Sequence, residues 1–485
     1  MKKHFILLTL SLLAVISGLA QTYTQTTMVT GLQYPVAFDI APDGRFFSTQ
    51  KGANALHAPG AIIKVHDATG SFISNFYDLS DSVNSDFERG LLGIALDPDF
   101  TNNHYVFVYY NHNYNNDERI RIVRFTEVNN QGTQPTIIFD LDVSESIAGN
   151  HVGGNLHFRP SEPNKIYFTI GDLAYQQGNP ALNYAKDLDK PFGKILRINK
   201  DGSVPTDNPY YDDGNPLTGN CDLIWSYGHR NPFDFCFSPV SDTMYSSENG
   251  WTTWDEVNVI HRGANYGWAY CEGDFANGST TVPCTTGVLP IETWGSPLPA
   301  VTGILYYSGQ VMPEFDNHLL VADNDYGRVY DLTLGNAPDY DVVLSRVQWM
   351  DMTTSGGLTT LKQGADGCVY AMKGGYTTNG QIYRVCPQGL DVNEQNAGGL
   401  AIRNYPNPFS TTTTVEWNHA ASGKVEIVLQ DIFGRTIAVL VNSEMQQGKQ
   451  QLTIDAQTLG LNSGNYLLTI RTESTAQTVL LTVSE

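Results

Sequence analysis

Short segments in which apolar and polar residues alternate recur along the central part of the chain, and this two-residue period favours β-strands over helices. One unit is repeated: an alternating apolar segment, a turn rich in Pro, Asp, Gly or Asn, and a second segment rich in aromatic residues. Two such segments joined by a turn predict a β-hairpin. The six copies span residues 36–49, 93–110, 155–172, 233–247, 304–330 and 358–373.

Six hairpins that are each too small to bury their own faces predict a closed radial array of sheets. We therefore expect an all-β fold with a six-bladed β-propeller over residues 21–387. Two longer segments between copies, residues 173–220 and 250–300, are expected to be loops on the face that carries the functional site.

The two ends of the chain differ from this central part. Lys2 and Lys3 precede an apolar run and a small-residue cleavage site, which predicts a secretory signal peptide over residues 1–20. Residues 388–399 are polar and turn-prone, as in a linker, and residues 400–485 return to short alternating strands, as in a small β-sandwich. No later apolar segment is long enough to cross a bilayer.

Six cysteines occur as three pairs of near neighbours, and an exported protein can form disulfides. The expected pairs are Cys221–Cys236, Cys271–Cys284 and Cys368–Cys386. No two cysteines have the Cys-x-x-Cys spacing of a thiolate zinc site or a redox dithiol.

A formal net charge of −22 indicates an acidic surface without a basic run that could neutralise a row of phosphates, so nucleic acid is not an expected partner. The abundance of Asp, Asn, Tyr and Gly suits polar loops that bind sugars or Ca²⁺.

His151 lies among glycines at the entrance of an expected strand, where its side chain can reach a ligand, and Asp172 ends the hairpin that follows. A carboxylate at that position can fix the tautomer of a histidine that acts as a general base. The alternative is a loop histidine that only caps a turn.

Three phrases near the C-terminus occur in a fixed order: residues 404–409 (NYPNPF), 431–435 (DIFGR) and 461–466 (LNSGNY). Together they resemble the C-terminal sorting domain of type IX secretion substrates. This resemblance implies export through the type IX secretion machinery to the cell surface or the medium, with the tail processed afterwards. An accessory carbohydrate-binding sandwich is the alternative, but the tail has few aromatic residues for a stacking platform.

The propeller region resembles the soluble sugar dehydrogenases that depend on pyrroloquinoline quinone (PQQ), the glucose/sorbosone dehydrogenase family. The phrases that carry the resemblance are residues 88–100, 151–172, 193–199, 227–232, 247–258 and 265–268. The resemblance implies oxidation of the anomeric carbon of an aldose to the lactone, with hydride transfer to PQQ.

In that family a histidine that matches His151 is the catalytic base, and a carboxylate that matches Asp172 orients it. Arg230 matches an arginine beside the reacting quinone oxygen, and Asn231 adjoins it. An ion pair at the surface is the plainer interpretation of Arg230.

The resemblance also implies Ca²⁺ that polarises the quinone, held by main-chain carbonyls of Gly250 and Trp251. Asp255, Glu256 and Tyr266 match the surroundings of a second, structural Ca²⁺. The alternative interpretation of Asp255 and Glu256 is that they are charged loop residues exposed to solvent.

The chain departs from the family where relatives bind the cofactor's carboxylates with basic residues, because Asp325, Gly357 and Thr359 match those positions. Arg328, Lys362 and Lys373 are possible substitutes. Trp251 also replaces a common Pro, and Glu88 and Arg89 change a position near the sugar.

These differences leave two other functions open: a noncatalytic propeller that binds sugar or protein, and a Ca²⁺-dependent lactonase. The sequence has no haem-attachment Cys-x-x-Cys-His motif and no nicotinamide-type Gly-x-Gly-x-x-Gly motif, so the dehydrogenase is expected to pass electrons to a separate acceptor.

Overall fold

The computed structural model describes residues 21–484 with gaps, and the chain divides after Gln388 into two compact units. The expected signal peptide and residues 389–399 of the expected linker lie outside the described residues. The gaps are residues 54, 56–58, 115–116, 144–148, 337–339, 355, 389–401, 408, 420–421, 432–434 and 473–475.

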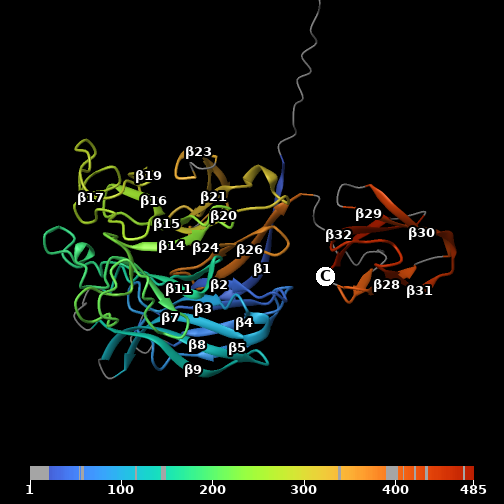
Figure 1. Ribbon diagram of the computed structural model, residues 1–485, viewed down its shortest axis with the longest axis horizontal. Coiled ribbons are helices and arrows are strands. Elements are labelled where there is room, and N and C mark those ends of the chain that lie inside the picture. Colours follow the sequence, from blue (N-terminus) through green and yellow to red (C-terminus); the bar gives the residue numbers. More distant parts are fainter. Residues whose placement is uncertain are drawn as a thin grey trace, which may run out of the picture. The chain divides into compact units, whose positions relative to one another are not determined.

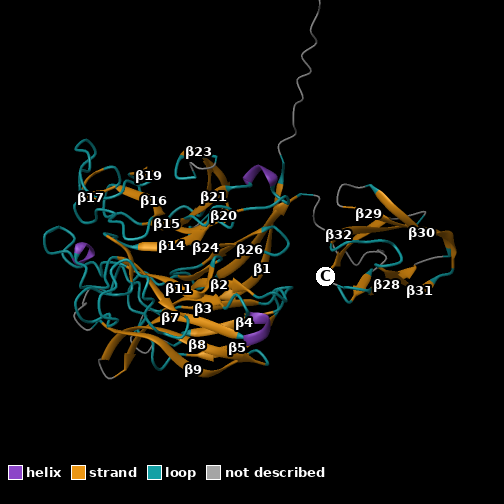
Figure 2. Cartoon of the chain, viewed as in Figure 1, coloured by secondary structure: helices purple, strands orange, loops and turns teal. Residues whose placement is uncertain are grey.

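The first unit contains six four-stranded antiparallel sheets, which are the blades of the predicted propeller (Figures 1 and 2). Blade 1 is β2 (Pro35–Ile40), β3 (Phe46–Gln50), β4 (Ile62–His66) and β5 (Phe72–Asp78). Blade 2 is β6 (Leu91–Leu96), β7 (Tyr105–Tyr114), β8 (Asp117–Val128) and β9 (Gln131–Asp142), with the short α1 (Phe100–Asn103) between β6 and β7. Blade 3 is β10 (Leu156–Arg159), β11 (Glu162–Ile170), β12 (Lys194–Asn199) and β13 (Ile224–Tyr227).

Blades 4 and 5 follow in the same order. Blade 4 is β14 (Pro232–Phe237), β15 (Met244–Glu248), β16 (Trp254–Ile260) and β19 (Glu292–Gly295), with a small hairpin of β17 (Cys271–Glu272) and β18 (Phe275–Ala276) inserted. Blade 5 is β20 (Val301–Tyr307), β21 (His318–Asp323), β22 (Arg328–Leu334) and β23 (Val343–Asp351).

The last blade combines both ends of the unit. It consists of β24 (Leu358–Gln363), β25 (Val369–Lys373), β26 (Gly380–Pro387) and the N-terminal β1 (Tyr23–Leu32). β1 runs antiparallel to β26 as the fourth strand, blue beside orange in Figure 1. The first strands of neighbouring blades contact one another in a closed ring, from β2 through β6, β10, β14, β20 and β24 back to β2. The six repeated hairpins of the sequence are therefore the two inner strands of the six blades.

Apolar side chains pack between neighbouring blades, so each blade buries its faces against two others. An aromatic contact occurs at every one of the six junctions, which explains why aromatic residues recur in the repeat. The pairs are Phe76–Phe125, Phe139–Phe168, Tyr167–Phe237, Tyr245–Tyr306, Tyr23–Trp349 and Phe46–Tyr370.

Residues 173–220 and 250–300 are not loops throughout, and this expectation was wrong. The first segment contains β12, and the second contains β16 and β19, all of which are outer strands of their blades. β12 is buried along most of its length, so it lacks the polar alternation by which the inner hairpins are recognised.

Two of the three expected disulfides are present, Cys271–Cys284 and Cys368–Cys386. The third is wrong: Cys221 packs in the core between blades 2 and 3, whereas Cys236 packs against the core between blades 4 and 5. Burial raises the pKa of both thiols, that of Cys221 to about 11.

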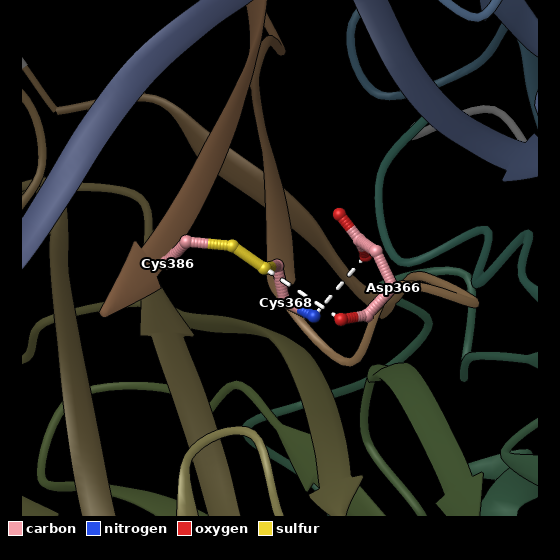
Figure 3. A group of neighbouring side chains, drawn as sticks. All are labelled: Asp366, Cys368 and Cys386. Atoms are coloured by element: carbon pink, nitrogen blue, oxygen red, sulfur yellow. Dashed lines mark hydrogen bonds between the residues drawn. A yellow bond between two sulfur atoms is a disulfide. The ribbon is translucent and has the colours of Figure 1, made fainter. Parts of the chain in front are cut away.

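Figure 3 shows Cys368–Cys386 joining the start of β25 to β26, with Asp366 beside it. The Asp366 carboxylate accepts a hydrogen bond from the Cys368 amide at 3.2 Å. Because both sulfurs are in the disulfide, this group of potential ligands is not a metal site.

The second unit is the predicted β-sandwich. One sheet contains β27 (Arg403–Tyr405), β28 (Thr412–His419) and β31 (Gly448–Asp455), and the other contains β30 (Thr436–Met445), β29 (Gly423–Asp431), β32 (Gly464–Arg471) and β33 (Ala476–Val483). Inward residues of both sheets, including the buried Trp417, form one core. Among the described residues of the whole chain, no helix has the length and apolar character that a membrane span requires.

Candidate functional site

A cavity of about 170 Å³ lies where the inner strands of the six blades meet. Every blade contributes to its wall, so the cavity exists only because the ring of blades is closed. The lining residues are Val36, Lys51, Glu88, Leu92, Gly93, Gly153, Gly154, Asn155, Asn231, Phe233, Asn249, Ala300, Thr302, Asn324, Thr359, Gly375 and Tyr376.

His151 lies in the glycine-rich segment that leads into β10, next to this wall. Its backbone is left-handed, with φ of 54°, and its amide donates to Oε2 of Glu88 at 2.6 Å. A Cβ at Gly171 would lie 2.3 Å from the His151 carbonyl oxygen, so glycine at the end of β11 allows the two segments to meet.

Asp172 holds the His151 ring. Nδ1 of His151 is 2.6 Å from Oδ1 of Asp172, which is fully buried. The other Asp172 oxygen accepts hydrogen bonds from Asn183 Nδ2 at 2.9 Å and Trp268 Nε1 at 2.7 Å, and the Ala174 amide donates to Oδ1 at 2.8 Å. Because Oδ1 of Asp172 accepts a hydrogen bond from the His151 ring, the pair favours the His151 tautomer with hydrogen on Nδ1.

Nε2 of His151 has no hydrogen-bond partner in the described part of the chain, and the side chain keeps 7% of its accessible surface. This nitrogen carries the lone pair in the tautomer that Asp172 selects. His151 is therefore built as an acceptor of a proton at Nε2.

Arg230 comes from the segment between β13 and β14. Its Nη1 donates to the Asn249 carbonyl at 2.9 Å and its Nε to Gln177 at 3.1 Å, while the guanidinium lies 5.6 Å from the ring centroid of Trp268. Burial lowers the pKa of Arg230 from its ordinary value, and an arginine remains cationic nevertheless. The surface ion pair considered from the sequence is wrong, because Arg230 is 9% exposed.

Asn231 lines the cavity, and its Oδ1 is buried without a hydrogen-bond partner among the described residues. Thr359, on blade 6, also lines the cavity, and its hydroxyl oxygen is likewise buried without a hydrogen-bond partner among the described residues. Buried polar atoms without partners are costly, so each of these two residues at the cavity wall would gain from a further hydrogen bond.

A second, smaller hollow of about 10 Å³ adjoins the Arg230 segment, with room for about one water or ion. Three glutamates line it: Glu248, Glu256 and Glu272. Burial, together with the neighbouring carboxylates, raises the pKa of Glu256 to about 8. Oε2 of Glu272 is buried and unpartnered, whereas its Oε1 accepts amide hydrogens from Trp251 at 2.7 Å and from the three residues that follow.

The other expected metal residues are divided between two environments. Gly250 and Tyr266 line the small hollow, but the Tyr266 hydroxyl is taken by the Val259 carbonyl at 2.6 Å. Asp255 accepts from the Gly250 amide at 2.9 Å and is not among the residues that line the hollow. The Trp251 side chain is 41% exposed and lies edge-on to Trp268.

The wall formed by blades 5 and 6 has a different character. Thr359 and Asn324 line it, and none of the three possible substitute cations does so. Arg328 pairs with Asp351 at 3.3 Å, and Lys362 reaches His157 at 3.4 Å. Lys51 is the basic residue of the described cavity lining, and its Nζ donates to the carbonyls of Ser85, Phe87 and Arg89.

Several site residues were missed from the sequence. Lys51, Asn183, Glu272 and Tyr376 occur outside any phrase that suggested a function, so no local pattern indicated them. Trp268 did belong to such a phrase, and its Nε1 contact with Asp172 gives that phrase a physical role.

Fold and site together define a six-bladed propeller with a buried histidine–aspartate pair beside its central cavity. The chain belongs to the glucose/sorbosone dehydrogenase family, because the family model described as Glucose / Sorbosone dehydrogenase matches residues 32–384. A second model, described as Secretion system C-terminal sorting domain, matches residues 403–484.

A curated relative agrees with this assignment. Quinoprotein glucose dehydrogenase B of Acinetobacter calcoaceticus is 31% identical over 274 residues, which are 52% of this chain and 54% of that protein. The match therefore spans about half of that relative's length.

Two solved structures share the fold. The soluble aldose sugar dehydrogenase of Escherichia coli, in its apo form, has a TM-score of 0.64 and 22% identity, covering 76% of this chain and 100% of that one. The PQQ-bound form of aldose sugar dehydrogenase from Streptomyces coelicolor has a TM-score of 0.57 and 24% identity, covering 75% and 99%.

Proposed function

We propose that this protein is an exported dehydrogenase that oxidises the anomeric carbon of an aldose to the lactone and uses PQQ as its hydride acceptor. The observation that carries the proposal is the His151–Asp172 pair, with its tautomer fixed at 2.6 Å and Nε2 left without a partner. The family and the printed names of its relatives, a quinoprotein and a PQQ-bound enzyme, support the cofactor.

The cavity suits such a cofactor at one end. Asn231, Leu92 and Phe233 line this end, and the two apolar side chains give walls for a planar ring system. Arg230 lines the adjoining small hollow and offers a fixed cation from there. At the other end Asn324 and Thr359 offer hydrogen bonds in place of cations, so we expect PQQ to bind without full compensation of its carboxylates.

In this mechanism His151 removes the proton from the anomeric hydroxyl at Nε2. Asp172 stabilises the imidazolium that forms and keeps the ring oriented, while hydrogen bonds from Asn183 and Trp268 hold the Asp172 carboxylate in place. PQQ, when bound, supplies the electrophilic carbon that accepts the hydride. The Arg230 guanidinium stabilises negative charge that develops on the acceptor side. Electrons then leave to a separate acceptor.

Ca²⁺ fits the neighbouring hollow. Glu256 and Glu272 supply hard oxygen ligands, and the raised pKa of Glu256 and the unpartnered Oε2 of Glu272 both indicate charge that a cation would compensate. The Tyr266 carbonyl is a further ligand in this proposal, and the carbonyls of Gly250 and Trp251 would hold the Ca²⁺ that polarises the cofactor. Asp255 acts through the Gly250 amide and positions that segment.

The sorting domain suggests secretion or a cell-surface location. We propose that the type IX machinery recognises it, so that the propeller meets its sugar outside the cell.

The test is reconstitution of the mature chain with Ca²⁺ and PQQ, with quinone binding followed by titration and turnover by dye reduction across a panel of aldoses. His151→Ala should lower kcat by about 10²- to 10⁴-fold while PQQ still binds, because it removes the base. The matched control is His318→Ala, since His318 also pairs with an aspartate, Asp331 at 2.7 Å, but on blade 5 away from the cavity lining.

Failure to bind PQQ would exclude the dehydrogenase and leave a noncatalytic propeller. Hydrolysis of lactones that requires Ca²⁺ but no quinone would select the lactonase.

A further inference from the structure

The loop between β12 and β13 contains a group of acidic residues that the proposed reaction does not use. Asp212, Asp213 and Asp222 each place one carboxylate oxygen within 4.8 Å of the others. No salt bridge joins any of the three to a Lys, Arg or His side chain within the described ranges. Like charges at this distance repel one another, and a cation bound between them would relieve the repulsion.

Asp222 supplies the independent observation that a ligand belongs here. Its side chain is completely buried, and its Oδ1 accepts the Asp212 amide hydrogen at 2.6 Å. Its Oδ2 is buried as well and has no hydrogen-bond partner among the described residues. A carboxylate oxygen buried in this way is strongly unfavourable unless it is satisfied. A proton shared with the neighbouring Asp213 carboxyl is one arrangement that satisfies it, and coordination of a metal ion by both carboxylates is the other.

The other two carboxylates are held in place by the loop itself. The Asn220 amide donates to Oδ2 of Asp212 at 2.8 Å. The Asn215 amide and the Thr218 hydroxyl donate to the two oxygens of Asp213 at 2.8 and 2.7 Å. Both aspartates are exposed, so water can complete a coordination shell on that side.

We infer that Asp212, Asp213 and Asp222 bind a divalent cation and that Ca²⁺ is the ion of choice. Carboxylate oxygens are hard ligands, and Ca²⁺ accepts irregular sets of six to eight oxygens that include carbonyls and water, whereas Mg²⁺ demands a near-octahedral set. A site with three carboxylates in an exposed loop corresponds to a Kd of about 10⁻⁴–10⁻³ M, the range of extracellular modules.

Such an ion would hold the loop against the beginning of β13. Asp222 comes two residues before β13, which leads to Arg230 and Asn231. Asn208, in the first half of the same loop, is buried and donates to the carbonyls of Arg197 at 3.0 Å and Asp222 at 2.8 Å. Asn208 thus already joins β12 to Asp222, and the ion would add a second connection between Asp222 and the loop. This site is separate from the hollow lined by Glu256.

Limited proteolysis of the mature full-length chain tests the inference at the loop itself. Leu217 is 74% exposed and Tyr211 is 37% exposed, so chymotrypsin can cut at both, and mass spectrometry can quantify each cut. Added CaCl₂ should slow these two cuts at least tenfold in the wild type and in Glu256→Gln, but not in Asp213→Asn. Asp341→Asn, a change of an exposed aspartate on another blade, should behave like the wild type.

Calcium content measured after equilibration at about 10 mM Ca²⁺, at least ten times the expected Kd, gives the second result. Asp213→Asn and Asp222→Asn should each bind one ion fewer per chain than the wild type. Because Asp213 is exposed, its variant remains informative even where the buried Asp222 variant does not fold. Equal protection of the wild type and Asp213→Asn, or an unchanged ion count in Asp213→Asn, would overturn the inference.

Discussion

The two sides of the central cavity differ in how many of their side chains are joined to one another by hydrogen bonds. On the side of blades 3 and 4, His151, Asp172 and Trp268 form a connected and buried set with Arg230 stacked on the Trp268 ring. On the side of blades 5 and 6, the wall carries Asn324, Thr359 and Gly375 and no described basic residue. Under the proposed function, the groups that act on the substrate would thus be separable from the groups that hold the cofactor's charge.

This difference has an electrostatic consequence. A carboxylate in a partly buried cavity gains most from an opposite charge within about 4–6 Å. The described lining residues of blades 5 and 6 offer only neutral donors, and Lys51, which lies over the Tyr376 ring, already donates to three carbonyls. Asp325, next to Asn324 in sequence, adds a carboxyl group whose pKa burial raises. We therefore expect the catalytic step to be intact and the affinity for a tricarboxylate to be modest.

The largest effect is expected at Asp172. In Asp172→Asn the amide can donate to Nδ1, which favours the wrong His151 tautomer and removes the lone pair from Nε2. Sugar oxidation should fall by roughly a hundredfold or more in kcat, with the Kd for PQQ changed less than threefold. The control is Asp331→Asn, which alters the His318 pair in the same way. A change in kcat below threefold would show that the blade 3 side is not the reacting side.

The hollow beside Arg230 predicts a pH-dependent loss of stability when Ca²⁺ is removed. The folded-state pKa of Glu256, about 8, lies above its ordinary value of 4.5, so the folded protein binds the proton more tightly than the unfolded chain. The stabilisation is present in full below pH 4.5 and is lost as pH rises through 8. The free energy of unfolding should therefore fall by up to about 1.4 kcal/mol per pH unit between pH 5 and pH 8.

Urea unfolding in chelator at several pH values measures this slope through Trp fluorescence, since six of the seven tryptophans precede Gln388. Glu256→Gln should flatten the slope, and saturating Ca²⁺ should do the same in the wild type. An equal slope in Glu256→Gln and wild type would assign it to another group.

The repeated hairpins made the propeller predictable, because each copy contains the two inner strands whose faces are buried between blades. β12 could not be recognised in the same way, since a strand buried on both faces has no alternation. The pairing of Cys221 with Cys236 failed for a related reason: nearness in sequence says little where the chain passes from one inter-blade core to another.

Two buried histidines show what sequence reasoning could decide about the site. His229 pairs with Glu248 at 2.9 Å, and its second ring nitrogen also has a partner, Ser226 at 2.9 Å. His151 differs only in that its Nε2 is left without one. A histidine near a carboxylate is visible in the sequence through family phrases, but whether its second ring nitrogen has a partner depends on how the blades are assembled.

The smallest expected effect concerns the neutral wall. Asn324→Arg adds a cation to a partly exposed position of the cavity lining, and it should tighten PQQ binding roughly tenfold with little change in kcat. The gain should shrink at high salt, because the added charge is partly exposed to solvent. Asn324→Gln is the matched control, since it lengthens the side chain without charge. A similar gain in both variants would point to packing as the cause, and no gain in the arginine variant would mean that the cofactor's carboxylates do not face blades 5 and 6.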